Sequence, residues 1–383
     1  MIHEIIDYET LRLIWWILLG TLLIGFAIMD GFDMGVAILL PFAAKTDTQR
    51  RIAINSIGPV WEGNQVWFIL GAGAIFAAWP IVYATAFSSF YGVLFLALIT
   101  LIIRPVGMKF RSKIFHPVWR SIWDFGLFLA GFVPALVFGI AFGNIFQGVP
   151  FHFDESLRSF VTGSLMDFFS SFTLICGLLS LSLFTMHGAT YLSLKTNGPI
   201  ANRAKRAGIF AAVAILFLFT LGWFWIKNGW VPGFRIVNIE TFNGPSNPLG
   251  KSVIQDPLAW LTNYKLYPWM IGAPLLGYGA TILTAAFLLM KCPGKAFISS
   301  AFSQLGIIST AGLSLFPFIF PSSSHPNNSL TIWDASSSHM TLFIMLISVI
   351  IFLPLILLYT AWVFRVMRGK VSAEEIASNP QSY

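Results

Sequence analysis

Four ionisable residues stand inside or at the edge of long apolar stretches of this 383-residue chain. Two carboxylates, Asp30 and Asp33, lie in IMDGFDMG, and a third, Glu62, follows in VWEGNQVW. The guanidinium of Arg104 ends the next apolar stretch in IIRPVG. Desolvation and a nearby guanidinium act in opposite directions on a carboxyl group, so such a set can exchange protons near neutral pH. The chemistry that these residue types predict is proton transfer within a membrane.

The composition identifies the solvent as lipid. Hydrophobic residues make up 56% of the chain and charged residues only 10%, whereas soluble domains average about 25% charged residues. A span needs roughly 20 mostly apolar residues, and in lipid a helix satisfies its own backbone hydrogen bonds. The sequence therefore predicts an all-α polytopic protein, one integral membrane domain over residues 1–383 with about nine transmembrane helices. We expect two four-helix bundles plus one helix, with spans at residues 11–40, 59–79, 81–103, 122–146, 162–192, 207–226, 267–290, 296–320 and 341–364.

The basic residues predict the orientation of these spans. With nine spans, 17 Lys and Arg residues fall on one side of the membrane and six on the other, and the richer side is expected to be cytoplasmic. The N-terminus is then periplasmic and the C-terminus cytoplasmic. The acidic start MIHEIIDYET does not resemble a cleaved signal, so we expect the first span to be retained. The net charge of +7 is thus a topology signal and does not indicate nucleic-acid binding.

The orientation places the four ionisable residues at similar depth. Asp30 and Asp33 fall toward the cytoplasmic end of the first span, and Glu62 about one turn inside the second. Arg104 ends the third span near the same boundary. We expect the group to converge, with Asp33, Glu62 and Asp30 as proton-transfer candidates. Their expected supporting partners are Arg104, Asn64, Gln65 and Trp61.

A structural interpretation stands beside this one. If the first span ended at Met29, both aspartates would lie at the membrane edge near a helix C-terminus, where acids are unfavourable but tolerated. They would then be pairing groups and would carry no protons. The residues alone leave the two interpretations open.

The remaining residues predict no complete active site in this chain. Of six histidines only His187 lies well inside an expected span, whereas a bis-histidine haem needs two facing ligands. The two cysteines, Cys176 and Cys292, are far apart in the sequence and suggest neither a disulfide framework nor a thiolate metal site. HExxH, P-loop and GxSxG motifs are absent from the sequence. We therefore expect no metal site.

Eight blocks, in order along the chain, resemble subunit II of the cytochrome bd-type ubiquinol oxidases. The resemblance extends from Asp7 to Tyr383. The blocks are DYETLRLIWWILLG, AIMDGFDMG, RRIAINSIGPVWEGNQVW, FAAWPIVYA, RPVG, AFGNIFQGVPF, FPFIFPSSS and SLTIWDASSS. The resemblance implies nine spans with an outside N-terminus. It also implies a partner, subunit I, that carries two haems b and one haem d and binds the quinol, so that this chain ligates no haem.

The resemblance further implies roles for the acids. In that family the carboxylates that match Asp33 and Glu62 are expected to line a proton route from the cytoplasm to the haems of subunit I. Relatives carry aspartate where this chain has Glu62, which moves the charge by about one bond length. The resemblance also leaves room for a structural quinone and for a small accessory subunit.

The sequence thus predicts a non-haem subunit of a quinol-oxidising, oxygen-reducing terminal oxidase in the bacterial cytoplasmic (inner) membrane. The alternative is a proton-coupled secondary transporter. A transporter would show a polar site at mid-membrane and inverted repeats, whereas here the acids gather toward one side and no repeated half is evident.

Overall fold

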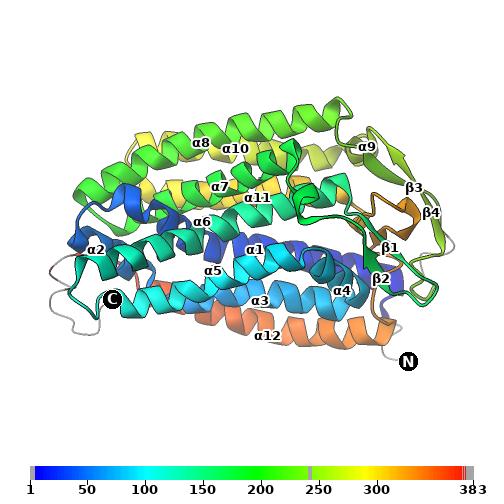
Figure 1. Ribbon diagram of the computed structural model, residues 1–383, viewed down its shortest axis with the longest axis horizontal. Helices are drawn as coiled ribbons and strands as arrows, with labels where there is room; N and C mark the ends of the chain where they lie inside the picture. The colour runs from blue at the N-terminus through cyan, green and yellow to red at the C-terminus, as the bar shows by residue number, and fades with distance from the viewer. Residues whose placement is uncertain (1–4, 240–243, 373, 375, 377–383) are drawn as a thin grey trace.

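The computed structural model describes residues 5–239, 244–372, 374 and 376, and it shows a bundle of long, roughly parallel helices (Figure 1). In this described part, eight helices are long and apolar enough to cross a bilayer. The prediction of an all-α polytopic membrane protein is confirmed. The eight are α1 (Tyr8–Ala43), α5 (Tyr91–Phe110), α6 (Pro117–Gln147), α7 (Ser171–Lys195), α8 (Gly198–Lys227), α10 (Gly272–Leu289, continuing η3 at Pro268–Ile271), α11 (Pro293–Leu315) and α12 (His339–Val366).

Helix α3 (Trp61–Ala78) occupies the place of the second expected span. It packs against α1 and contacts α12 (Figure 1), but polar residues in its first turns make it less apolar than the other eight. Its 18 residues correspond to about 27 Å, close to the thickness of the hydrocarbon core. The third expected span is divided into α4 (Pro80–Ser89) and α5, which meet at Phe90.

Helix α1 is central to the bundle. It packs against α3 and α6 on one side and against α7 and α11 on the other. Helices α7, α8, α10 and α11 pack against one another as one group, α1 joins α3, α5 and α6 in a second, and α12 contacts α1 and α3. The two groups are also joined to each other, because α1 and α6 both pack against α7.

The contact between α1 and α7 is unusually close. A Cβ atom built on Gly188 would stand 2.5 Å from the Cα of Gly35, and one built on Gly35 would stand 2.8 Å from the Cα of Gly188. Such distances leave room for hydrogen alone at both positions. Small residues that let helix backbones approach are typical of packing between membrane helices.

Short strands gather at the end of the bundle where α1 begins (Figure 1). Three antiparallel strand pairs, one α-helix and two short 3₁₀ helices form this outer cap. The cap contains β1 (Phe151–Phe153) with β2 (Ser159–Val161), β3 (Gly233–Ile239) with β4 (Lys251–Asp256), and β5 (Phe318–Phe320) with β6 (Leu330–Thr331), together with η2 (Leu165–Phe168), α9 (Ala259–Leu266) and η4 (Pro326–Asn328).

The expected span at 162–192 is wrong at its start, because α7 begins only at Ser171. The segment before it contains apolar residues, and one of them packs within the outer cap. This residue, Phe168, is buried and its ring lies 5.3 Å from that of Phe90. Apolar residues that pack in a protein core are of the same types as those that face lipid, so the sequence alone could not separate this segment from the span.

The outer cap is fixed to the helices by buried polar contacts. Lys251 of β4 and Asp334 form an ion pair at 2.6 Å, with both side chains almost fully buried. Burial raises the pKa of Asp334 and lowers the pKa of Lys251, and each charge opposes the shift of the other. Tyr8 donates to the carbonyl of Ser337 at 2.6 Å, which joins the start of α1 to the segment before α12.

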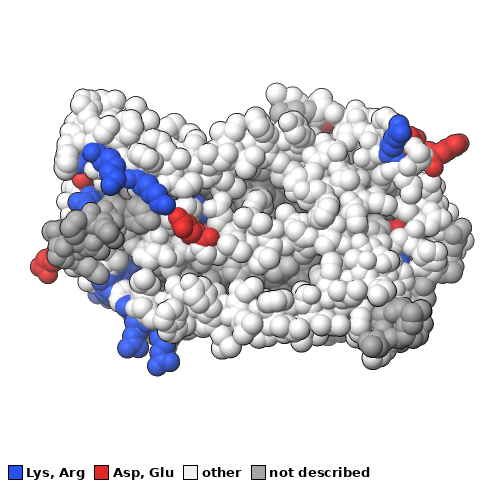
Figure 2. All heavy atoms as spheres, turned by 90° about the horizontal axis from the view of Figure 1, so that it is seen from below, with Lys and Arg blue, Asp and Glu red and all other residues white. Residues whose placement is uncertain are grey.

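The opposite end carries α2 (Asp47–Ile57) and most of the basic side chains. Figure 2 shows Lys and Arg gathered toward this end on the face that it presents. Just after α5, Arg111 is buried and donates to Asp124 of α6 at 2.5 Å and to Asp47 at 2.9 Å. Although burial acts to lower it, the pKa of Arg111 is raised overall, because these carboxylates stabilise the guanidinium. The sequence analysis did not identify this cluster.

Candidate functional site

Both aspartates lie within the continuous helix α1. The helix passes Met29 and ends only at Ala43, so the first span does not stop before the acids. Asp30 and Asp33 are three residues apart and therefore share one face, and their exposed fractions are 1% and 0%. The expected alternative of a first span that ends at Met29 is wrong, and both aspartates are buried among the helices.

Arg104 reaches Asp30 from α5. Its Nη2 lies 2.5 Å from Asp30 Oδ1, and both side chains are buried. The guanidinium carbon also stands 5.7 Å from the centre of the Trp61 ring, near enough for a cation–π contact. The first and third expected spans thus meet at a buried ion pair.

Asp33 is held from α3. Asn64 Nδ2 donates to Asp33 Oδ2 at 2.8 Å, and Asn64 is itself buried. The amide gives this carboxylate a neutral partner, whereas Asp30 has a cationic one. The two acids of one helix face thus have different surroundings.

Glu62 does not join this buried cluster, and the expectation that all three carboxylates converge is wrong. Its side chain is 64% exposed and lies 3.4 Å from Lys109 Nζ. On α3, Trp61 and Asn64 are buried while Glu62 is exposed and Gln65 half-buried. The sequence fixes the depth of Glu62 through the start of α3, but α3 is apolar around most of its circumference and its rotation could not be predicted.

Seven buried polar atoms around this part of α1 have no hydrogen-bond partner within the described residues. Two of them belong to Gln304 of α11, which was not among the expected site residues. It lies close to α1, because a Cβ built on Gly31 would stand 3.7 Å from its Nε2. Polar residues at helical spacing in FISSAFSQLG were a signal for it. The atoms are Asp30 Oδ2, Asp33 Oδ1, Arg104 Nε and Nη1, Trp61 Nε1, and Gln304 Oε1 and Nε2. Buried polar groups are normally satisfied by protein or by ordered water.

His187 of α7 lies against the other side of α1. Its Nδ1 is 2.7 Å from Ser300 Oγ, and its Nε2 is 2.9 Å from the carbonyl of Ile28. Both ring nitrogens are therefore engaged by the protein, and the ring stacks on Phe297 at 4.7 Å. Over the described residues no group of three or more His, Cys, Asp or Glu side chains could hold a metal ion.

The arrangement is suited to holding protons inside the bundle. Two carboxylates in different surroundings lie on one face of α1 and are flanked by unsatisfied donors and acceptors. A carboxyl group can both take up and release a proton, and water bound to such atoms can relay one between them.

The chain is similar to known proteins over nearly its whole length. Residues 11–367 match the family of cytochrome bd terminal oxidase subunit II. The chain is 47% identical over 379 residues to the probable cytochrome oxidase subunit 2 of Haemophilus influenzae, which covers 98% of this chain and 99% of that protein. It is 46% identical over 377 residues to the cytochrome bd-I ubiquinol oxidase subunit 2 of Escherichia coli K12, with the same coverage. The solved bd oxidase of Geobacillus thermodenitrificans shares the fold, with a TM-score of 0.63 at 17% identity over 93% of this chain and 98% of that chain.

Proposed function

The chain belongs to the family of cytochrome bd terminal oxidase subunit II, and from that premise we propose that it conducts protons for a quinol-oxidising, oxygen-reducing complex in the bacterial inner membrane. In this proposal the redox chemistry takes place in subunit I, the haem-bearing partner. The present chain delivers cytoplasmic protons toward the site where oxygen is reduced to water.

The observation that carries the proposal is the Asp33 carboxylate, fully buried on α1 with one oxygen on Asn64 and the other without a protein partner. An unpaired carboxylate in the interior of a membrane helix is costly, and such groups commonly mark proton pathways. Asp30 lies one turn away, and the Arg104 guanidinium provides a fixed positive charge beside it. Water that satisfies the seven unpaired atoms would join these groups into one route.

We place subunit I against the outward face of α3. Glu62 lies on this face with Val66, Ile69, Gly73 and Phe76, all of them exposed. A carboxylate on a membrane helix is unfavourable toward lipid, so a protein partner is the better cover. Glu62 then becomes buried at the contact, where it passes protons from the cytoplasmic side to subunit I.

The haems expected in such a complex do not fit this chain. The one histidine in the interior of a described span, His187, uses both ring nitrogens in protein contacts. The proposal therefore assigns two haems b, one haem d and the quinol site to subunit I.

Turnover tests the route. Asp33→Asn and Glu62→Gln keep the size and polarity of each side chain but cannot ionise, so each is expected to lower oxygen consumption per haem d by about tenfold or more. Glu62→Asp should keep most of the turnover, since it retains a titratable group. Oxygen consumption of the purified complex, divided by its haem d content, is the measurement.

A matched control is Asp256→Asn in the outer cap, which pairs with Arg235 at 3.7 Å and should not change turnover. If these acids only pair and pack, the two amide variants will lose haem and subunit I together while turnover per haem stays normal. Normal turnover per haem in both variants would overturn the proton route.

The proposed orientation has its own test. Because the basic side chains gather at the end where α12 finishes, we expect the C-terminus in the cytoplasm. A reporter that fluoresces only in the cytoplasm should be bright when joined after Tyr383, and a reporter active only in the periplasm should be silent there. The opposite pair of results would reverse the orientation and the proposed proton source with it.

A further inference from the structure

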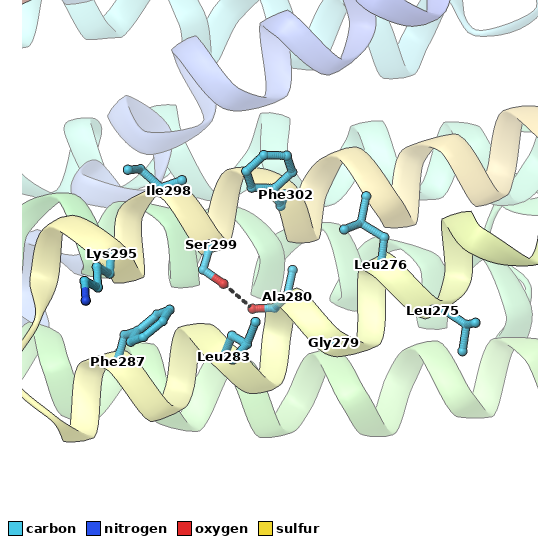
Figure 3. Close-up of a pocket in the computed structure, with 10 residues that line it drawn as sticks. All are labelled: Leu275, Leu276, Gly279, Ala280, Leu283, Phe287, Lys295, Ile298, Ser299 and Phe302. Atoms are coloured by element: carbon cyan, nitrogen blue, oxygen red, sulfur yellow. Dashed lines mark hydrogen bonds between the residues drawn. The ribbon is translucent and has the colours of Figure 1, made fainter.

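An apolar groove runs between α10 and α11, and all of its lining residues belong to these two helices. Its volume is about 430 Å³, within the range of roughly 300–1,000 Å³ that is usual for ligand sites. Figure 3 shows Lys295 and Leu275 at its opposite ends and Ser299 between the two helices. Ser299 is buried and its hydroxyl donates to the carbonyl of Ala280, so the floor of the groove presents no free hydroxyl.

The groove has the length of one lipid leaflet. From Leu275 to Phe287 it follows α10 for twelve residues, or about 18 Å, while half of the hydrocarbon core is about 15 Å. Leu275, Leu283 and Ile298 line it and are more than half exposed in the chain. An extended hydrocarbon chain along the membrane normal fits this shape and this chemistry.

The end of the groove at Lys295 is positively charged. Lys295 lines this end and is exposed, as is Lys291 in the turn between α10 and α11. The helices α8, α10 and α11 contain no acidic residue that could neutralise them. Lys205 of α8 lies nearby and donates to the carbonyl of Leu289 at the end of α10. This end of the groove therefore favours an anion.

The backbone adds to the same charge. Helix α11 begins after Cys292, whose side chain makes no capping hydrogen bond, and its first helical bond is the one from Ala296 to the Cys292 carbonyl. The amides of Gly294 and Lys295 thus precede the hydrogen-bonded helix, at its positive end. The adjacent carbonyls of α10 are taken by Lys205, Lys291 and Cys292.

We propose that this groove binds one anionic phospholipid, with an acyl chain along α10 and α11 and the headgroup phosphate at Lys291, Lys295 and the first amides of α11. Basic pockets between membrane helices are a known way to hold anionic headgroups. The site lies on the opposite side of the bundle from α3, so the lipid stabilises the α8–α10–α11 group and takes no part in proton transfer. It is independent of the proposed proton route.

Native mass spectrometry of the whole oxidase complex tests the site. The complex is stripped of lipid and then titrated with phosphatidylglycerol or with zwitterionic phosphatidylcholine. The unaltered complex should bind one phosphatidylglycerol more tightly than phosphatidylcholine. The double variant Lys291→Gln with Lys295→Gln should bind phosphatidylglycerol about tenfold or more weakly, since each lysine near a headgroup contributes roughly a fivefold preference. Its affinity for phosphatidylcholine should be unchanged.

A second variant blocks the chain without changing the charge. A side chain at Gly279 would meet no atom within 4 Å, so Gly279→Trp can fill the groove without disturbing the helices, and it should remove the bound lipid of either kind. Gly222→Trp on α8, which also points into open space, is the matched control and should bind as before.

Three results would overturn the proposal. Equal binding of the two lipids by the unaltered complex would remove the role of the lysines. Full competition by millimolar inorganic phosphate would show a site for free phosphate in place of a lipid. Loss of a co-purified quinone from Gly279→Trp, with phospholipid unchanged, would show a quinone in the groove.

Discussion

Arg104→Ala is expected to prevent stable assembly of the oxidase. The substitution leaves Asp30 buried in the interior of α1 without its counter-charge, and removing one partner of a buried pair costs about 3–5 kcal/mol. This is a large part of the stability of most proteins. Membranes that contain the variant should hold much less of both subunits and of haem, as measured by immunoblot and by optical spectrum.

A compensating double variant tests whether the loss of assembly is caused by the unpaired charge of Asp30. Arg104→Met combined with Asp30→Leu replaces the pair by apolar side chains of similar size, a change that is often neutral or stabilising, so assembly should return. Arg235→Ala removes an exposed ion pair and should have little effect. Normal haem content in Arg104→Ala would mean that Asp30 does not need the guanidinium.

Gly188→Ala is expected to have the second largest effect. The added methyl would stand 2.5 Å from both the Cα of Gly35 and the amide nitrogen of Val36. Since these are backbone atoms of α1, no side-chain rotation relieves the clash and the helices must separate. Overpacking usually costs about 1–3 kcal/mol and occasionally more. The temperature at which the purified complex loses half its haem signal should fall by several degrees.

The control for this variant is Gly20→Ala on α1, the other helix of the contact, where a Cβ meets no atom within 4 Å. It should leave the transition unchanged or raise it slightly, because alanine favours the helix. If Gly188→Ala melted like the unaltered complex, α1 and α7 would not be held at the distance described here. The same shift of α1 should also disturb the contact between Asp33 and Asn64.

The pair of Asp30 and Arg104 could be predicted because it depends on depth alone. Hydropathy gives the ends of each span. Because successive spans cross the membrane in opposite directions, the first and third spans end at the same side and at a similar depth. Arg104 is a long side chain in otherwise apolar surroundings, so one buried carboxylate at its level is its natural partner.

The place of Glu62 could not be predicted, because it depends on rotation about the helix axis. A helix that is apolar on most sides gives no periodic signal to show which face turns inward. Asn64 and Glu62 are two residues apart and so point in different directions, and only the packed structure shows that Asn64 turns toward Asp33. The side of α3 that carries Glu62 was therefore expected to turn inward, whereas it is exposed.

The outer cap escaped prediction for a different reason. The loops and the spans of a membrane protein contain the same kinds of apolar residue. Composition therefore predicted a fifth span from residue 162, whereas α7 begins at Ser171. Phe151 pairs with Val161 across two short strands, and no helical or strand periodicity in the sequence indicates this pairing. Such contacts are set by tertiary packing.

Hydrogen bonds between α1 and the residues around the start of α12 can form only late in synthesis of the chain. Tyr8 bonds to Ser337, and the Trp15 indole bonds to the carbonyl of Leu342, across more than 300 residues of sequence. The ribosome makes α1 first, yet these partners emerge only when nearly nine-tenths of the chain has been synthesised. The first helix must therefore wait in the bilayer for the whole of translation, and it is during this interval that the nascent chain is most open to premature partners and to degradation.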